Sequence, residues 1–377
     1  MNACFAVLTP PGRGALASIG VWGPDAVALV QSCIQSTGGA SRTIQEPDRF
    51  RLSRLRAADI NDEVVVVSHG GTDPAVEVIC HGGPALMDGI RRHLSDLGAV
   101  ESAWEDWIKA RETDLIAAEA AIALTQAATV QTANHLLDQL HGGLRRCVLR
   151  LRADCLRAAE SHSSGREVVE QLEGLLAGRR IGMHLTEPWQ ILVAGPVNAG
   201  KSSLINALVG YERSITAPTP GTTRDLVSVQ MAIDGWPVEL VDTAGWRSNA
   251  VGLEARGIAK MLNAAAAADL ILWIVDGTQP EIAVPLEMAA FRPVIVRNKS
   301  DLLEHTLTWP QDVSARTGAG LRQLQARIVG DLLGMMPDAG SPLLFTERQI
   351  AAVQRALSAS RTADWQSAAV ALASLVG

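Results

Sequence analysis

Residues 190–203 read Gln190-Ile-Leu-Val-Ala-Gly-Pro-Val-Asn-Ala-Gly-Lys-Ser-Ser203, and they carry the clearest structural signal in this chain. An apolar run typical of a buried strand comes first, and a segment with helical apolar spacing follows. Between them lies G-x-x-x-x-G-K-S, in the strand–loop–helix context that a phosphate-binding loop requires. Backbone N–H groups at such a helix N-terminus favour an anion. A glycine turn with only a structural role is the alternative.

The side chains of this loop have distinct expected roles. Lys201 is expected to reach the β- and γ-phosphates of a nucleotide and to act in catalysis, and Ser202 to ligate Mg²⁺. Further nucleotide contacts are expected from Asn198, Ala199, Gly200 and Ser203.

Lysine is rare in this chain, which uses arginine for most positive charges. Of the 33 basic residues only four are lysines, namely Lys109, Lys201, Lys260 and Lys299. A lysine is therefore a candidate for a position that needs a compact ammonium group on a thin stem. Two of the four lie in the nucleotide-binding motifs.

Later motifs select guanine as the base. Asp242-Thr-Ala-Gly245 ends one apolar run, where Asp242 is expected near Mg²⁺ and the Gly245 amide near the γ-phosphate. Asn298-Lys299-Ser-Asp301 ends another, and the Asp301 carboxylate can accept hydrogen bonds from guanine N1–H and its exocyclic amine. Adenine would leave that carboxylate unpaired. Asp301 as a simple helix cap is the alternative. We expect GTP or GDP as the ligand.

The remaining base contacts come from two further motif segments. Asn298 is expected to brace the loops and the stem of Lys299 to lie over the base. Ser314-Ala315-Arg316 follows at a plausible distance and offers a backbone N–H to guanine O6.

The loop Ala217-Pro-Thr-Pro-Gly-Thr-Thr-Arg-Asp225 precedes the strand expected at 226–233. Thr223 is expected to be the second Mg²⁺ ligand and the γ-phosphate sensor, with nucleotide contacts from Ala217, Thr219 and Thr222. An ordinary connecting loop is the alternative. Asp234-Gly235 then predicts a hairpin that adds one antiparallel strand to the sheet edge.

Composition bounds the remaining possibilities. The 377 residues allow two or three domains of about 150 residues each. With 47% apolar and 19% charged residues, the chain is neither disordered nor collagen-like. A net charge of −7 excludes a wholly basic surface, although local basic patches stay open. Five cysteines without a C-x-x-C pair argue against a disulfide framework or zinc ribbon. We expect a cytoplasmic protein without signal or membrane segment.

Three kinds of segment organise the chain. Residues 1–112 mix short strands with helical segments at 25–35 and 84–98, which predicts an α+β domain. Residues 113–186 predict long helices with two breaks, at 141–143 and 161–165, and the chain is helical again towards its end. Strands and helices alternate over 187–337. The expected fold is an α/β phosphate-loop domain (187–337) inserted into an all-α helical domain (113–186 and 338–377), preceded by the α+β domain.

Together these motifs resemble the TrmE–Era–Der branch of translation GTPases. The resemblance narrows to the MnmE/TrmE family of tRNA-modification GTPases through Thr9-Pro-Pro-Gly-Arg-Gly14, Glu77-Val-Ile-Cys-His-Gly-Gly-Pro84 and Asp114-Leu-Ile-Ala-Ala-Glu-Ala120. It covers most of the chain and is densest at 190–320. The resemblance implies GTP hydrolysis, a homodimer of G domains, a tRNA substrate modified at the wobble uridine, and a flavoprotein partner.

The resemblance also implies a potassium-assisted mechanism, because Trp246 stands where other GTPases have a water-aligning glutamine. Asn198 and Thr222 would then hold K⁺. Glu254 matches the acidic residue that orients the attacking water, and Arg247 also fits the family pattern. A solvent-facing helix glutamate is the alternative for Glu254.

Two regions depart from the family pattern. The family's folate pocket in the N-terminal domain uses an Arg where this chain has Gly20 and a Lys where it has Glu112, so that only Glu77 is retained. The family ends in a C-x-G-K tail, whereas the last cysteine here is Cys155. These departures put folate binding and the wobble-uridine chemistry in doubt. A GTP-switched dimeric interaction module that has lost the modification chemistry is therefore the alternative function.

Two arginine-rich segments leave an RNA contact open. One alternates arginine with apolar residues over 49–56 and is otherwise a half-buried edge strand. The other carries five arginines on one helical stretch and is otherwise a solvated face: Arg145, Arg146, Arg150, Arg152 and Arg157. His81 lies in a tight H-G-G-P turn and is expected to be structural, and no metal is assigned to the histidines.

Overall fold

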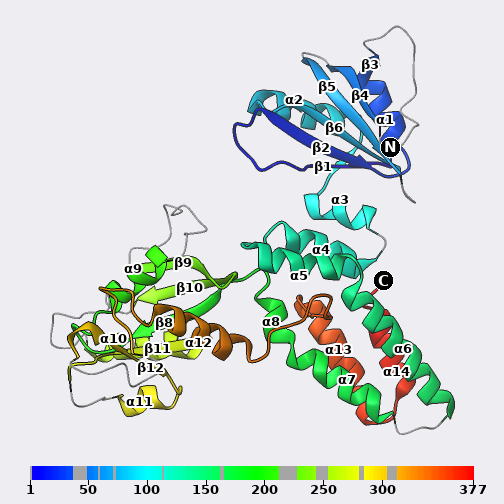
Figure 1. Cartoon of the computed structure of the whole chain (residues 1–377). Coiled ribbons are helices and arrows are strands. Elements are labelled where there is room, and N and C mark those ends of the chain that lie inside the picture. The colour runs from blue at the N-terminus through cyan, green and yellow to red at the C-terminus, as the bar shows by residue number, and fades with distance from the viewer. Residues whose placement is uncertain are drawn as a thin grey trace. The chain divides into compact units, whose positions relative to one another are not determined.

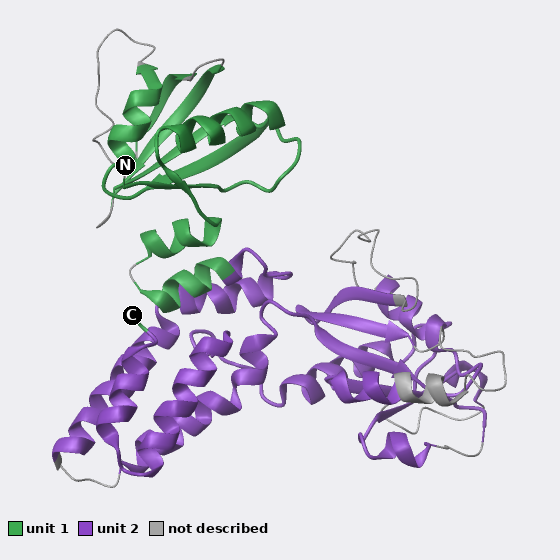
Figure 2. Cartoon of the chain, turned by 180° about the vertical axis from the view of Figure 1, so that it is seen from behind, with its two compact units in different colours: residues 1–122, 376–377 green, residues 123–375 purple. Residues whose placement is uncertain are grey.

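The computed structural model describes residues 2–36, 49–57, 60–70, 74–112, 114–161, 165–211, 227–242, 254–279, 284–303 and 312–377. They form two compact units, one of residues 1–122 with 376–377 and one of residues 123–375 (Figures 1 and 2). The first unit extends beyond the boundary expected at 112. Its N-terminal sheet is followed by helix α4 (Leu115–Leu124), whose Leu115 N–H donates to the backbone oxygen of Val376 at 3.0 Å.

The first unit is built on a seven-stranded sheet of order β3-β4-β5-β6-β2-β1-β7. All neighbouring pairs are antiparallel except β1 and β7. Its elements are β1 (Cys4–Val7), β2 (Leu16–Trp22), α1 (Ala26–Cys33), β3 (Ile34–Ser36), β4 (Phe50–Ala57), β5 (Ile60–His69), β6 (Ala75–His81), α2 (Pro84–Asp96), β7 (Val100–Glu101) and α3 (Trp104–Arg111).

The two faces of this sheet are covered by different helices. Alternate strand residues such as Ile19 and Val66 pack under α1 and α2, together with Leu29 and Ile90. The opposite face carries α3, whose Trp107 is buried against β1, β2 and β6. The period-2 alternation of the strands therefore supplies two separate cores.

The basic strand expected over 49–56 is β4, and it is not an edge strand. On its outer side the three residues of β3 pair with Ser53–Leu55, with Ile34 opposite Leu55. Arg54 forms a cross-strand ion pair with Glu63 at 3.1 Å, while Phe50 is 75% exposed. The ion pair agrees with the prediction that these arginines are solvated. The prediction that this strand lies at the edge of the sheet was wrong, because β3 lies outside it.

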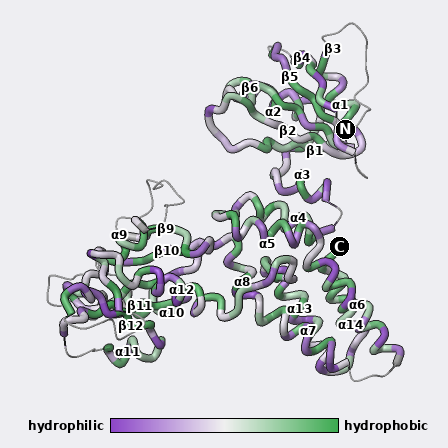
Figure 3. The backbone as a smooth tube through the Cα atoms, in the orientation of Figure 1, coloured by the Kyte–Doolittle hydropathy of each residue, from purple (hydrophilic) through white to green (hydrophobic). Residues whose placement is uncertain are grey.

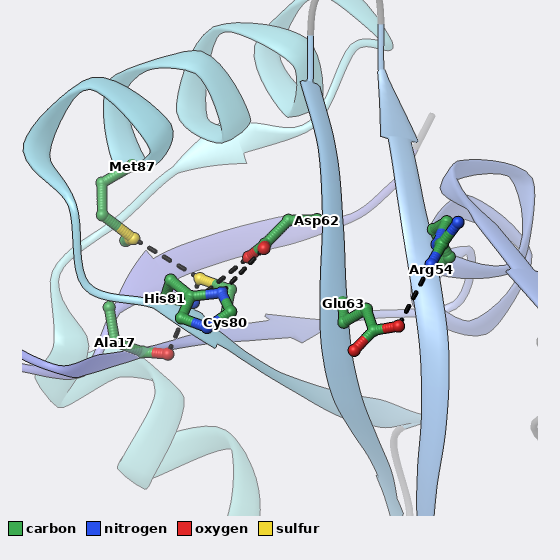
Figure 4. A network of polar contacts seen from close by, with 7 residues as sticks. All are labelled: Ala17, Arg54, Asp62, Glu63, Cys80, His81 and Met87. Atoms are coloured by element: carbon green, nitrogen blue, oxygen red, sulfur yellow. Dashed lines mark hydrogen bonds and ion pairs between the residues drawn. The ribbon is translucent and has the colours of Figure 1, made fainter.

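The turn after β6 is held by a carboxylate of β5 (Figure 4). Asp62 accepts hydrogen bonds from the backbone N–H of His81 at 3.2 Å and from its Nδ1 at 2.7 Å. Beside them, Cys80 Sγ lies 3.7 Å from both the backbone oxygen of Ala17 and the sulfur of Met87. Burial, and then the Asp62 charge, raise the pKa of Cys80 to about 11. These contacts give His81 the structural role expected for it.

Two separated stretches of the second unit, one before and one after its sheet, contribute helices that pack together. Helix α13 packs against α7 and α14, and α14 packs against α6. Figure 3 shows the alternation of hydrophilic and hydrophobic residues along α6. The helices of these two stretches are α5 (Val130–Leu140), α6 (Gly143–Ser161), α7 (Arg166–Ala177), α8 (Arg179–Met183), α13 (Glu347–Arg361) and α14 (Trp365–Ala373).

The first helical stretch has more breaks than the two expected from sequence. The expected breaks separate α5, α6 and α7, but α4 ends before Thr129, which caps α5. The Thr129 hydroxyl accepts from the Thr132 N–H at 3.1 Å, and the Thr132 hydroxyl reaches back in a capping box. Gly178 separates α7 from α8. Thr129 and Gly178 are helix-capping residues, and such helix ends are not revealed by the spacing of apolar residues alone.

The same unit contains a five-stranded sheet of order β12-β11-β8-β10-β9. All pairs are parallel except β9 with β10, which confirms the antiparallel edge strand. Positive φ at Asp234 (46°) and Gly235 (82°) matches the expected hairpin turn. The elements are β8 (Trp189–Ala194), α9 (Lys201–Tyr211), β9 (Val227–Ile233), β10 (Trp236–Asp242), α10 (Glu254–Ala267), β11 (Leu270–Asp276), α11 (Leu286–Ala289), β12 (Val294–Asn298) and α12 (Leu321–Leu333).

The turn of this hairpin contacts α5. The Trp236 ring stacks on His135, with centroids 5.6 Å apart and an interplanar angle of 25°. Both side chains are buried, and burial lowers the pKa of His135. A Cβ at position 235 would lie 3.0 Å from Gln131, so glycine suits this approach as well as the turn. The hairpin of β9 and β10 is thus anchored on helix α5.

No helix within the described ranges combines the length and the apolar character needed to cross a membrane.

Candidate functional site

The carboxyl ends of the parallel strands bring the predicted motifs together. β8 lies in the middle of the sheet, between β11 and β10, and runs into the loop before α9. Asp242 ends β10, Asp276 ends β11 and Asn298 ends β12. In a parallel sheet, ligands bind outside these carboxyl ends at the point where the strand order reverses.

Three left-handed residues give the phosphate loop its curvature. Gly195 (φ 140°), Asn198 (φ 64°) and Gly200 (φ 87°) all have positive φ. A Cβ at Gly195 would lie 2.1 Å from the backbone oxygen of Ile274, and one at Gly200 would lie 2.3 Å from Asn298 Nδ2. Both glycines are therefore required by close neighbours as well as by φ.

Lys201 begins α9 and is buried, with 8% of its surface exposed. Its Nζ donates to the backbone oxygens of Gly195 at 2.9 Å and Pro196 at 2.8 Å. The side chain of Lys201 thus reaches back over the phosphate loop, which directly precedes its own helix α9. This places a fixed positive charge beside backbone N–H groups, which suits a polyphosphate.

Ser202 and Asp242 meet at the point where a divalent cation is expected. The Ser202 hydroxyl donates to Asp242 Oδ2 at 2.8 Å, and Asp242 is 6% exposed. Hydroxyl and carboxylate oxygens are the ligands that Mg²⁺ prefers. Their donor set therefore fits Mg²⁺.

Asn298 connects the phosphate loop with the segment after β12. Its Nδ2 donates to the backbone oxygens of Ala199 at 3.1 Å and Gly200 at 3.4 Å, and its Oδ1 accepts from the Ala315 N–H at 3.1 Å. The side chain is 3% exposed. This is the geometry of the bracing role expected from the motif.

Lys299 is held by an aspartate that the motifs do not contain. Its Nζ donates to Asp276 Oδ2 at 2.6 Å. Partial burial raises the pKa of Asp276, but hydrogen bonds from Lys299 and Thr278 outweigh it, so the pKa lies below its usual value. Sequence reasoning missed Asp276, although it follows the apolar run 270–275 directly and thereby marks the end of a strand.

Asp301 is oriented by a buried serine. The Ser314 hydroxyl donates to Asp301 Oδ1 at 2.6 Å, and Arg316 Nη1 lies 3.6 Å from Oδ2. Ser314 is fully buried, whereas the Arg316 side chain is 81% exposed. One carboxylate oxygen is thus fixed by a rigid partner, and the other faces a solvent-exposed guanidinium.

The N–H groups of the Ser314-Ala315 segment are used within the protein. The Ser314 N–H donates to the backbone oxygen of Ala319 at 2.9 Å, and the Ala315 N–H binds Asn298 as described above. The clearest observed role of Ser314 is therefore the orientation of Asp301.

Several predicted site residues lie outside the described part of the chain. Glu254 is the first residue of α10, but its side chain is outside the described part of the chain. Ser203 is described, and it lies exposed in the first turn of α9. The residues outside the described part are Ala217, Thr219, Thr222, Thr223, Gly245, Trp246 and Arg247.

Comparison with known proteins shows that the sequence of this chain is similar to those of GTPases. The sequence model of the family described as "50S ribosome-binding GTPase" matches residues 190–299. A "tRNA modification GTPase MnmE" of Thermus thermophilus is 31% identical, over 93% of this chain and 87% of that protein. The protein of the same description from Bordetella petrii is 32% identical, over 93% and 85%. The G domain of the T. maritima FeoB iron transporter is 21% identical, with a TM-score of 0.29, and covers 38% of this chain and 99% of that one.

Proposed function

The chain belongs to the family of tRNA modification GTPases described as MnmE, and on that premise we propose how its residues carry out the activity. The protein is a GTP-hydrolysing enzyme of tRNA modification that uses Mg²⁺. The observation that carries the site assignment is the Ser202–Asp242 hydrogen bond beside the buried Lys201. It joins the phosphate loop to the end of the neighbouring strand.

We propose the following division of labour, which these positions support. Lys201 and the loop N–H groups bind the β- and γ-phosphates, while Asp301 accepts from the guanine edge. Ser202 and Asp242, with Thr223, would hold Mg²⁺, which neutralises phosphate charge when it is bound. Asn298 keeps the phosphate and base segments in register.

We propose further that hydrolysis is assisted by K⁺ held by Asn198 and Thr222. Asn198 is exposed at the outer turn of the phosphate loop, with φ 64°, so its amide oxygen is available to a cation. Such a charge would stabilise the developing negative charge on the phosphates. In this proposal Glu254 orients the attacking water and Arg247 supports it, in the place of the glutamine that Trp246 replaces.

We also propose the family arrangement of domains and partners. The G domain (187–337) is then inserted into a helical domain (113–186 and 338–377), and packing of α13 and α14 on α6 and α7 supports this. A homodimer of G domains and a flavoprotein partner belong to the same proposal.

The test of the function has two readouts. We expect the purified chain to hydrolyse GTP roughly tenfold faster in KCl than in NaCl at equal ionic strength, because only K⁺ would fill the proposed cation site. Equal rates in the two salts would remove K⁺ from the mechanism without affecting the nucleotide site.

The second readout is nucleoside analysis by mass spectrometry of tRNA from cells with and without the gene. Loss of a modified wobble uridine on deletion is the expected result. An unchanged nucleoside profile in cells whose purified protein hydrolyses GTP would favour the alternative function, a GTP-switched interaction module.

The arginine face of α6 is our proposed contact for tRNA. The five arginines at 145, 146, 150, 152 and 157 are exposed and span about 18 Å at 1.5 Å per residue. Arg157 also pairs with Asp154, and Arg146 donates to the backbone oxygen of His141 at 2.7 Å. A dense positive face in a chain of net charge −7 suits a phosphate backbone.

Removing two of these charges should weaken tRNA binding in a salt-dependent way. We expect the variant with Arg145→Gln and Arg152→Gln to lower the slope of log affinity against log salt by about 1.5. Arg292→Gln with Arg322→Gln, which removes two exposed charges from the α/β part, is the matched control. Equal slopes for both double variants in fluorescence anisotropy with a tRNA transcript would place the contact elsewhere.

A further inference from the structure

The face of the N-terminal sheet opposite α1 and α2 carries a cluster that the nucleotide site does not use. Gly20 of β2 is the register partner of Glu77 of β6, and Val67 of β5 lies opposite Glu77 on its other side. Since side chains two residues apart in a strand share a face, Ser18 of β2 and His69 of β5 lie on the same face as Gly20 and Glu77. The resemblance described above implies a folate pocket in this domain, with Glu77 as its retained residue.

Trp107 fills the space over Gly20. A Cβ at position 20 would lie 2.6 Å from Cδ2 and Cε3 of the indole and 3.0 Å from Cε2. The indole therefore lies against the bare Cα of β2, closer than any residue with a side chain would allow. Trp107 is 4% exposed and makes an edge contact with Trp22, with centroids 5.8 Å apart. The slot thus holds an aromatic ring from the chain itself.

The carboxylate beside this slot already has donors. Glu77 Oε1 accepts from the Ser18 hydroxyl at 2.5 Å, and Oε2 accepts from His69 Nε2 at 3.1 Å. Arg111 Nη2 lies 3.2 Å from His69 Nδ1, and because arginine can only donate, Nδ1 accepts and Nε2 carries the proton. The Glu77 carboxylate is therefore engaged by two protein groups.

Helix α3 supplies both the ring and the cation of this cluster. Its Arg111 guanidinium lies 5.0 Å from the Trp107 ring centre, and the His69 ring makes an edge contact with the same indole at 5.8 Å. A planar ring, a stacked cation and a carboxylate with two donors are the features by which a protein binds a heteroaromatic ligand. Here all of them are satisfied internally.

We infer that Trp107 and Arg111 of α3 are a built-in occupant of this sheet site, and that the chain does not bind folate there. A folate ring would have to displace an indole that is almost completely buried and to replace the donors to Glu77. The residues present do not fit the cofactor, so the N-terminal domain works without it. This inference does not depend on GTP hydrolysis.

Folate binding is the first test. We titrate the full wild-type chain with tetrahydrofolate and with its stable 5-formyl derivative and measure the heat of binding by calorimetry. We expect no saturable binding of either compound up to about 1 mM. GTP binding by the same preparation is the positive control for folded protein. Saturable binding of either folate by the wild-type chain would overturn the inference.

A double-mutant cycle tests the occupancy of the slot. Gly20→Ala alone places its Cβ against the ring, so we expect amide exchange in β2 and β6 peptides to accelerate roughly tenfold or more. In the Trp107→Ala background, Gly20→Ala should leave the rate of amide exchange unchanged or lower it, because alanine suits a strand better than glycine. Equal effects in both backgrounds would show that the indole does not occupy the slot.

Discussion

Replacing Lys201 by alanine should weaken GTP binding by at least about 1000-fold and abolish hydrolysis. Lys201 is buried under its own loop, where its ammonium bonds the backbone oxygens of Gly195 and Pro196. Charged hydrogen bonds to phosphate are worth about 1.5–3 kcal/mol each, and the Lys201 ammonium makes two hydrogen bonds at this loop. Isothermal titration with a non-hydrolysable GTP analogue measures the effect.

The matched control for this variant is Lys109→Ala. Lys109 is half-exposed, and its Nζ bonds Asp106 at 3.1 Å on the surface of α3. Its removal should leave GTP affinity unchanged within a factor of about two, because surface ion pairs contribute little. If Lys201→Ala bound GTP as well as Lys109→Ala does, the phosphate site would lie elsewhere in the chain.

The motifs of the proposed nucleotide site could be recognised in the sequence because each of them is a short contiguous stretch. A phosphate loop needs glycine at fixed positions, and the positive φ of Gly195 and Gly200 shows why. The bracing of Asn298 against Ala199 and Gly200 joins positions nearly a hundred residues apart, yet each end lies in a recognisable motif. Local motifs therefore revealed a contact that is distant in sequence.

What could not be predicted are partners without a motif of their own. Asp276 holds Lys299 only because β11 and β12 are neighbours in register, with Asp276 opposite Asn298. Such pairs depend on strand order, which the sequence does not state locally.

Helix α3 was missed although its signal was present. Trp104, Trp107 and Ile108 follow the i, i+3, i+4 spacing of a helix face, with acidic residues in the first turn and basic residues in the last. Its eight residues are short for a periodicity argument, so the helix became evident only from its packing. The omission matters because this helix fills the slot over Gly20.

The second large effect is expected for Asp301→Asn, which should exchange the preferred base. Guanine offers two donors to the Asp301 carboxylate, and an amide can accept only one of them while its own N–H₂ opposes the other. We expect GTP affinity to fall about 100- to 1000-fold. Xanthine carries a carbonyl in place of the exocyclic amine, so the variant should bind xanthosine triphosphate more tightly than GTP.

The surroundings of Asp301 determine which way the new amide points. The Ser314 hydroxyl donates at 2.6 Å to Oδ1, so the asparagine oxygen takes that position and its N–H₂ takes the place of Oδ2, which lies 3.6 Å from Arg316. Asp331→Asn, which removes a carboxylate paired with Arg327 on α12, is the control and should leave base preference unchanged. Competition between GTP and xanthosine triphosphate for binding to the Asp301→Asn variant measures the change in base preference. If the variant kept the wild-type preference for GTP, the base would be recognised by other groups.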